Sequence, residues 1–302
     1  MHLKIIGDIS LDDVPQGRVV VLPKVESLCL VMSDSKWGYK LATHMSCPSA
    51  KYTSLKHEKD TKDVTPKEIF PASVSWNAIV RQYTRSPVEE IALEIKTALD
   101  FTKASSLTFR SPDATIISLC FEVAENDEDE DEDEGEPEIL AEIYHEVFSQ
   151  ASRTIRDLTL VANVNCLRVC HCLHDIGYLD IARIAYQVGQ LFTSVGSLEE
   201  LTLHHCDMRP YLAPFLDNPA LCDVKPLVAF PPIKELTISY LLYVSCGDFA
   251  AAIVGLVESQ HALGAPFERV TVRMDNLPAE MTERLRLWVS TVHCYSEPYR
   301  GD

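Results

Sequence analysis

The chain has 302 residues, 46% hydrophobic and 24% charged, which is typical of a folded protein and is enough for one large domain or two ordinary ones. Its formal net charge is −18, but eleven acidic residues lie between Glu125 and Glu138, and without them the rest of the chain carries −7. A negative surface lacks the basic footprint that nucleic acid or an anionic membrane needs, so neither is expected as a partner.

The N-terminal residues predict neither a leader nor a membrane anchor. The apolar stretch near Met1 is too short for a signal peptide, and the longest apolar run, Phe249 to Val257, is too short to span a membrane. Ten cysteines are scattered along the chain, several of them in apolar phrases such as Leu28-Cys29-Leu30. We therefore expect an intracellular protein, cytoplasmic or nuclear, with buried free thiols.

A short phrase recurs from the first part of the chain onward: an apolar residue, two others, an apolar residue, one other, and an apolar residue. In the N-terminal half it occurs at Val25 to Leu30, Val88 to Leu93 and Ile116 to Phe121, with a weaker copy at Ala50 to Leu55. The intervals between these copies are uneven. Two long loops are expected, Asp12 to Gly17 and His57 to Pro71.

The acidic tract, residues 124–138, is predicted to be a disordered loop inserted into one repeat. The interval from Ile116 to Val164 is 48 residues, and without the fourteen from Glu125 to Glu138 it becomes 34. Consecutive acids lack the glycine spacing of a calcium loop and favour a solvated, self-repelling segment, with weak electrostatic docking as the second possibility. A helix is expected after it, from Ile139 to Ile155.

The phrase becomes regular in the C-terminal half. It begins at Val164, Leu198, Ile233 and Phe267, with intervals of 34, 35 and 34 residues. It resembles the leucine-rich-repeat signature, whose Asn/Cys position Cys172 and Cys206 occupy. The predicted fold is therefore an α/β solenoid spanning residues 1–302 as a single domain. Its curved parallel sheet would have helices on the convex side, with less regularity in the N-terminal half.

Helices are expected between the strands of this half. The apolar spacing predicts them at Ile181 to Thr193, Asp248 to Gln260 and Ala279 to Val289, with a short one at Met208 to Phe215. Gly264-Ala265-Pro266 would end the second of the three long helices.

The polar residues of the strand phrases should point away from the core and form a concave partner-binding face. We expect protein recognition there, with no catalysis, cofactor or metal. The predicted partner-binding residues are Arg168, Cys170, Glu200, Thr202, His204, Glu235, Thr237, Ser239, Arg269, Thr271 and Arg273. The alternative reading is an ordinary solvated strand face, with its threonines explained by β propensity.

A cluster of cysteine and histidine residues supports a second hypothesis. Cys170 and Cys172 lie one repeat before His204, His205 and Cys206, so parallel strands would bring them close together. Zinc takes such ligands, and a histidine beside Asp207 has the chemistry of a general base. The spacing is not that of paired CxxC motifs, however, and no nucleophile motif accompanies it.

Several phrases resemble fungal F-box proteins, whose C-terminal regions are degenerate leucine-rich arrays. The resemblance rests on Leu263 to Val272, Leu277 to Met281 and Leu285 to Val289, and on two proline-led strand phrases, Leu22 to Leu28 and Phe230 to Leu236. It covers most of the chain from about residue 20. It implies the substrate-recognition region of a cullin–RING ubiquitin ligase.

One departure from that family concerns its helical F-box. The first phrase begins near Val25, and Leu22-Pro23 leads into a strand, so the adaptor-docking motif has no room. The resemblance thus implies an F-box-less paralogue or a truncated chain, leaves docking to the ligase adaptor in doubt, and keeps open a decayed paralogue without a ligase role.

Overall fold

The computed structural model describes residues 1–7, 19–32, 40–60, 90–97, 102–113, 116–124, 164–172, 198–204, 232–239, 246–273 and 279–295, with isolated positions between them. Contacts divide the chain into two compact units, Met1–Asn163 and Val164–Asp302. The boundary falls at Val164, the first residue of the regular repeats. The acidic tract and the helices expected at 139–155 and 208–215 lie outside the described residues, apart from single positions.

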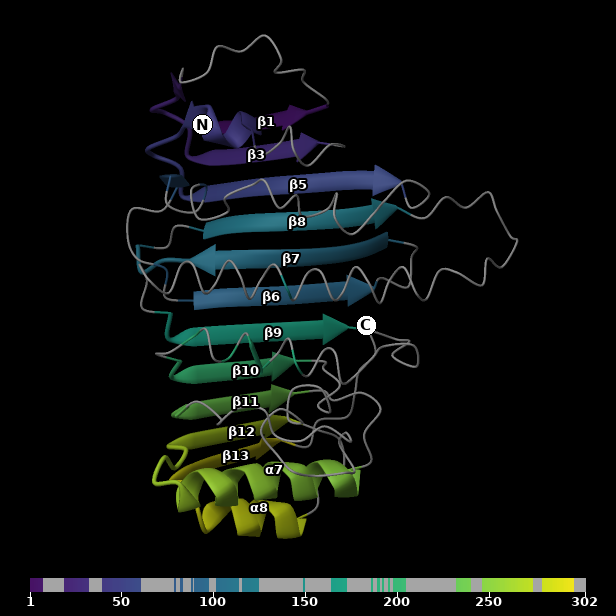
Figure 1. The fold of residues 1–302 in the computed structure, drawn as a ribbon, viewed down its shortest axis with the longest axis vertical. Helices are drawn as coiled ribbons and strands as arrows, with labels where there is room; N and C mark the ends of the chain where they lie inside the picture. The colour runs from purple at the N-terminus through teal and green to yellow at the C-terminus, as the bar shows by residue number, and fades with distance from the viewer. Residues whose placement is uncertain are drawn as a thin grey trace, which may run out of the picture. The chain divides into compact units, whose positions relative to one another are not determined.

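The first unit contains a mixed sheet whose strands lie side by side in the order β1, β3, β5, β8, β7, β6 (Figure 1). The strands are β1 (His2–Ile6), β3 (Ser27–Met32), β5 (Tyr52–Asp60), β8 (Ile116–Ala124), β7 (Thr102–Arg110) and β6 (Glu90–Thr97). The pairs from β1 to β8 are parallel, whereas β7 is antiparallel to both β8 and β6. A small parallel pair, β2 (Val20–Val21) with β4 (Met45–Ser46), stands apart from it.

The antiparallel part corrects the expectation of a parallel sheet in this half. Only four residues separate β6 from β7, and five separate β7 from β8. Connections that short reverse the chain and cannot form the crossover that parallel neighbours require. The predicted strands at β6 and β8 are present, but β7 was missed, and the loop expected from His57 is wrong at its start because β5 continues to Asp60.

The register also corrects the position of the repeat phrase in β8. Ile116 pairs with Tyr52, the third residue of the phrase that begins at Ala50, and Tyr52 pairs with Ser27. Ile116 is therefore the third residue of its own phrase and not the first, as the sequence was interpreted. Because that interpretation also set the interval from 116 to 164, the 34-residue spacing derived across the acidic tract is wrong.

The second unit contains five parallel strands that are neighbours in chain order (Figure 1). They are β9 (Cys166–Cys172), β10 (Glu200–His204), β11 (Glu235–Ser239), β12 (Arg269–Arg273) and β13 (Thr291–Tyr295). The first four coincide with the four regular phrases, so their positions and parallel pairing are confirmed. The fifth strand was not expected.

The apolar positions of the phrase form continuous rows across these strands. The register aligns Leu167, Leu201, Leu236 and Val270 in one row, and Val169, Leu203, Ile238 and Val272 in the next. Each of these eight side chains is at most 1% exposed. Alternation along each strand thus separates a dry face from a polar one.

Two helices follow β11 and β12, and they contact each other. α7 (Cys246–Ala262) buries Ile253, Leu256 and Val257, as expected, and α8 (Ala279–Arg286) buries Met281 and Leu285. α8 ends three residues earlier than predicted because the amides of Leu287 and Trp288 turn back to carbonyls three residues before them. None of the helices in the described parts is long and apolar enough to cross a membrane.

Gly264 ends α7, as the sequence predicted. Its φ is +76°, its amide donates to the His261 carbonyl, and the next amide, of Ala265, donates to the Gln260 carbonyl. This pair of bonds is a Schellman cap, which requires a left-handed residue after the helix. In the helix expected at 181–193, the described residues Tyr186, Gly189, Gln190 and Phe192 are helical.

One hydrogen-bond pattern marks the start of the parallel strands in both units. A carbonyl just before each strand accepts two consecutive amides from the next strand: Asn165 accepts from Glu199 and Glu200, and Glu199 accepts from Lys234 and Glu235. The same double acceptance occurs at Met1, Glu26 and Lys234. The repeat therefore shares a backbone geometry, beyond its apolar pattern.

Candidate functional site

Polar side chains form three rows on the solvent face of the second unit's sheet. The register aligns Glu200, Glu235 and Arg269 in the first row, next to Cys166 of β9. The second row contains Arg168, Thr202, Thr237 and Thr271, and the third contains Cys170, His204, Ser239 and Arg273. All eleven residues predicted for partner binding thus come together on one face, at spacings set by the sheet.

The exposure of these side chains is uneven. Arg168, Arg269 and Arg273 are exposed, and most of the others are half-buried, as side chains within a sheet face are. Ser239 is the exception at 5% exposed, and its neighbour in the first row, Cys166, is 7% exposed. The three arginines are therefore the side chains most available to a partner.

The first row combines like and opposite charges. Arg269 Nη1 lies 3.0 Å from Glu235 Oε2 on the adjacent strand, which neutralises that carboxylate. Glu200 stands directly opposite Glu235 on the other side. Within the described part of the chain no cation pairs with Glu200, and like charges in opposed positions weaken a sheet.

The third row contains a close contact between His204 and Ser239. The His204 Nδ1 atom lies 2.5 Å from the Ser239 Oγ atom, and Cys170 is the register partner of His204 on the other side. A serine beside an imidazole has the composition of a nucleophile and base, but the buried Ser239 hydroxyl has little access to a substrate.

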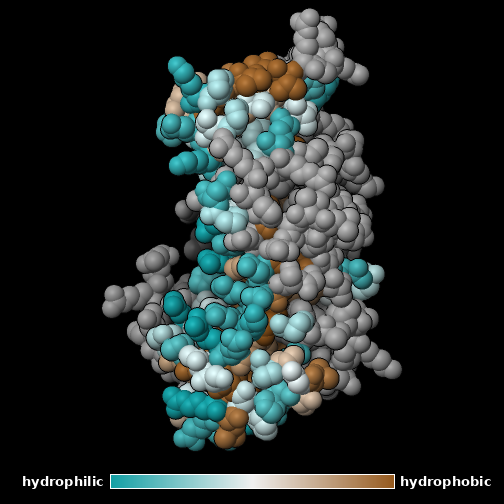
Figure 2. Space-filling view, turned by 90° about the vertical axis from the view of Figure 1, so that its left-hand side faces the viewer, coloured by the Kyte–Doolittle hydropathy of each residue, from teal (hydrophilic) through white to brown (hydrophobic). Residues whose placement is uncertain are grey.

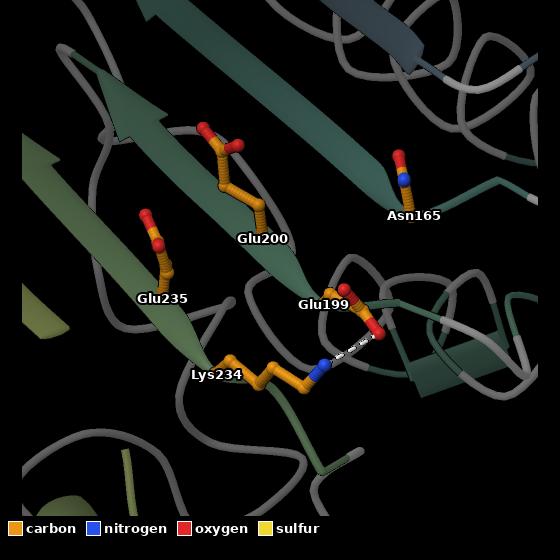
Figure 3. A pocket seen from close by; sticks show the side chains of 5 residues that line it. All are labelled: Asn165, Glu199, Glu200, Lys234 and Glu235. Carbon is orange, nitrogen blue, oxygen red and sulfur yellow. Dashed lines mark hydrogen bonds and ion pairs between the residues drawn. The ribbon is translucent and has the colours of Figure 1, made fainter. Parts of the chain in front are cut away.

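A shallow pocket lies where β10 and β11 begin (Figure 3). Asn165, Glu199, Glu200, Lys234 and Glu235 line it, and the side chains of Glu200 and Glu235 rise on the same side of their strands. Lys234 Nζ lies 2.7 Å from Glu199 Oε1, and this hydrogen bond raises the pKa of Lys234, followed by the charge of Glu199. Figure 2 views the side where the parallel strands begin, and its lower part is mainly hydrophilic.

β13 extends the polar rows by one strand that the sequence analysis missed. Thr291, His293 and Tyr295 are the register partners of Arg269, Thr271 and Arg273. The guanidinium carbon of Arg273 lies 5.3 Å from the centre of the Tyr295 ring, and that ring stacks on His293 with centres 6.2 Å apart. The phrase was present at Val289 to Cys294, but 22 residues separate it from the phrase at Phe267, so it fell outside the period.

The metal hypothesis is only partly covered by the described residues. The side chains of Cys170 and His204 are described, whereas His205 and Cys206 lie outside the described ranges, as does the side chain of Cys172. Among the described residues no three histidine, cysteine or acidic side chains come close enough together to hold a metal ion. The described cysteines are free thiols, and Cys47 and Cys166 are the buried ones.

In the first unit, exposed apolar side chains gather near the start of the chain. Met1, Ile6, Val19, Val20 and Val21 are each more than half exposed, and Figure 2 shows hydrophobic surface at the upper end. Leu3 and Ile5 of β1 are only half-buried, although their register partners Leu28 and Leu30 are completely buried.

Comparison with protein-family models, with curated proteins and with solved structures finds no match to this chain.

Proposed function

We propose that this chain is a leucine-rich-repeat-like solenoid that binds another protein on the polar face of β9–β12. By resemblance, this would be the substrate-recognition region of an F-box protein, without catalysis of its own. The observation that supports it most is the alignment of the polar phrase positions in register across four strands whose opposite face is at most 1% exposed. Repeat proteins bind partners on such continuous strand faces.

Charge supports a protein partner over a nucleic acid. The face carries Arg168 and Arg273 beside Glu200 and the Glu235–Arg269 pair, so both signs occur within a few strands. A mixed face discriminates between partners by complementarity, whereas nucleic acid needs an excess of basic groups.

Affinity purification with mass spectrometry tests the proposal on the full chain. The test variant combines Arg168→Glu, Glu235→Arg and Arg269→Glu, which reverses the charges of the face but keeps the Glu235–Arg269 pair. The control combines Arg286→Glu, Glu258→Arg and Arg284→Glu, with the same net change around the Glu258–Arg284 pair of α7 and α8. We expect partners to be lost only with the test variant, and an identical partner list for both variants would contradict the proposal.

The His204–Ser239 contact favours one second candidate, a zinc-binding or hydrolytic protein that uses Cys170, His204 and their neighbours. Elemental analysis of the purified chain after dialysis separates the two. Stoichiometric zinc that is lost with His204→Ala would favour this candidate over protein recognition.

A further inference from the structure

We infer that the β13 end of the second sheet captures an extended acidic segment of the partner protein, which adds as a strand beside β13 and places a carboxylate on Arg273. This inference rests on the proposed binding function and specifies the chemistry of the partner. Three observations support it: the open edge of β13, the arginine–aromatic stack on it, and the distribution of charge.

The edge of β13 offers backbone groups for pairing. Among the described strands, β13 pairs only with β12. The Thr291 amide donates toward the β12 side, to the Glu268 carbonyl. Because backbone groups alternate along a strand, the amides and carbonyls of Val292 and Cys294 point away from β12, toward the open edge. An incoming strand finds two donors and two acceptors there, which is the basis of recognition by strand addition.

The sequence of β13 leaves this edge unprotected. Natural edge strands are usually blunted by lysine, other charges or proline. Thr291 to Tyr295 contains no acid, lysine, arginine or proline, and Val292 and Cys294 remain half-buried where their partners Val270 and Val272 are completely buried. An added strand with apolar residues on that side would complete both inner rows.

The solvent side of the same edge carries an arginine–aromatic stack, formed by Arg273, Tyr295 and His293. Tyr295 is 41% exposed, and Arg273 and His293 are also exposed. Arginine and tyrosine are the residues that most often dominate binding energy at interfaces. Stacking on the ring orients the planar guanidinium, whose donors match a carboxylate.

Charge determines which strand fits. The solvent-facing residues of β12 and β13 include no acid, and Arg269 is already paired with Glu235. No described carboxylate pairs with Arg273, whose printed contact is the Tyr295 ring. A strand lying about 4.8 Å beyond β13 brings an acidic side chain next to Tyr295 within reach of the guanidinium on that ring. Alternation then places apolar side chains of the same segment against Val292 and Cys294.

The test uses the full chain and a fluorescein-labelled peptide that alternates valine with glutamate, followed by fluorescence anisotropy. We expect binding that weakens about tenfold with Arg273→Ala, because one charge-assisted pair is lost. Arg286→Ala, an exposed arginine on α8, is the matched control and should leave the affinity unchanged. Thermal melts confirm that both variants fold.

Two altered peptides separate the contributions. Replacing glutamate by lysine should abolish binding because of charge, and N-methylated valines should abolish it because the backbone donors are removed. Equal binding of all three peptides, or equal binding by wild type and Arg273→Ala, would overturn the inference. Arg273-dependent binding of a single-stranded oligonucleotide in place of the acidic peptide would also overturn it. So would a concentration-dependent dimer that His293→Pro abolishes, because the edge would then bind a second copy.

The outcome is distinguishable from failure of the proposed function. If the charge reversals on β9, β11 and β12 remove partners but the peptide does not bind, only this inference fails. If the peptide binds but the partner list ignores those reversals, the polar face of β9–β12 is not the recognition surface.

Discussion

At the scale of single residues, Tyr83 fixes the segment around β4 in the first unit. It is 4% exposed, and its hydroxyl lies 2.8 Å from the Ala42 carbonyl and 3.1 Å from the Met45 carbonyl. Gln82 Nε2 donates to the same two carbonyls. Removing the hydroxyl therefore loses one buried hydrogen bond without leaving either carbonyl unpaired.

We expect Tyr83→Phe to lower the free energy of unfolding by about 1 kcal/mol, and not by the larger amount of an orphaned buried group. Urea unfolding followed by circular dichroism measures it. A loss of more than about 3 kcal/mol would show that Gln82 does not compensate.

Burial, and then the charge of Cys47, raise the pKa of Tyr83, so the fold favours its neutral form. A raised pKa stabilises the fold below the pKa of the unfolded chain, about 10, and this contribution is lost as the pH rises further. Wild-type stability should fall above about pH 10, and Tyr83→Phe should flatten that decline. The Cys47 thiol, whose pKa burial also raises, contributes in both proteins from about pH 8.5 upward.

Thr53 presents the opposite case, a buried hydroxyl without a hydrogen-bond partner. It is 1% exposed and occupies the register position of Leu28 in an apolar row. Valine has nearly the same shape, so Thr53→Val should raise the free energy of unfolding by about 1 kcal/mol. Thr202→Val on the half-exposed polar face is the control, with a change within about 0.5 kcal/mol. Destabilisation at position 53 would mean that its hydroxyl is hydrogen-bonded in solution.

At the scale of elements, the glycine that ends α7 can be compared with one inside the helix. Gly264 has φ +76°, whereas Gly255 lies within α7, and a Cβ on either meets no atom within 4 Å. Gly264→Ala should therefore lower the free energy of unfolding by about 1 kcal/mol through backbone strain alone. Gly255→Ala should raise it by a similar amount, because alanine favours helix. Thermal unfolding of both variants decides, and equal signs would contradict the cap.

The sequence predicted elements where apolar spacing repeats and failed where it does not. Leu201 with Leu203 and Leu236 with Ile238 identified β10 and β11 because buried rows require apolar residues at fixed positions. β7 has no such phrase, since Thr102 to Arg110 is mainly polar. In β8 both Ile116 and Ile117 are apolar, so the phrase fits two alignments and only pairing with β5 distinguishes them. Strand direction depends on connection length, which the phrase does not encode.

The candidate face was predictable to the same extent. Alternation placed residues such as Arg168 and Thr202 on the polar side, and the register confirms that side. Sequence could not show that Glu235 is neutralised by Arg269, that Ser239 is covered beside His204, or that Arg273 meets Tyr295. Each depends on side-chain contacts between strands, and the last depends on a strand outside the regular period.

At the scale of the whole molecule, burial decreases toward the end of the second sheet. Leu236 and Ile238 in the middle are at most 1% exposed, whereas Val292 and Cys294 at the end are half-buried. Repeats are stabilised by their neighbours, so a strand with one neighbour opens more easily. We expect backbone amides of β13 to exchange with deuterium at least about tenfold faster than those of β11. Uniform protection across both strands, measured by mass spectrometry, would contradict this gradient.

The double hydrogen bond at the strand starts has a consequence for how such a molecule varies over time. Phrases 34 and 22 residues apart are followed by strands that pair in the same register, because the carbonyl before each strand fixes where the next one begins. The polypeptide between strands can therefore lengthen or shorten without displacing the polar rows. Lineages, and protein engineers, can exchange those intervening segments freely while the recognition surface keeps its geometry.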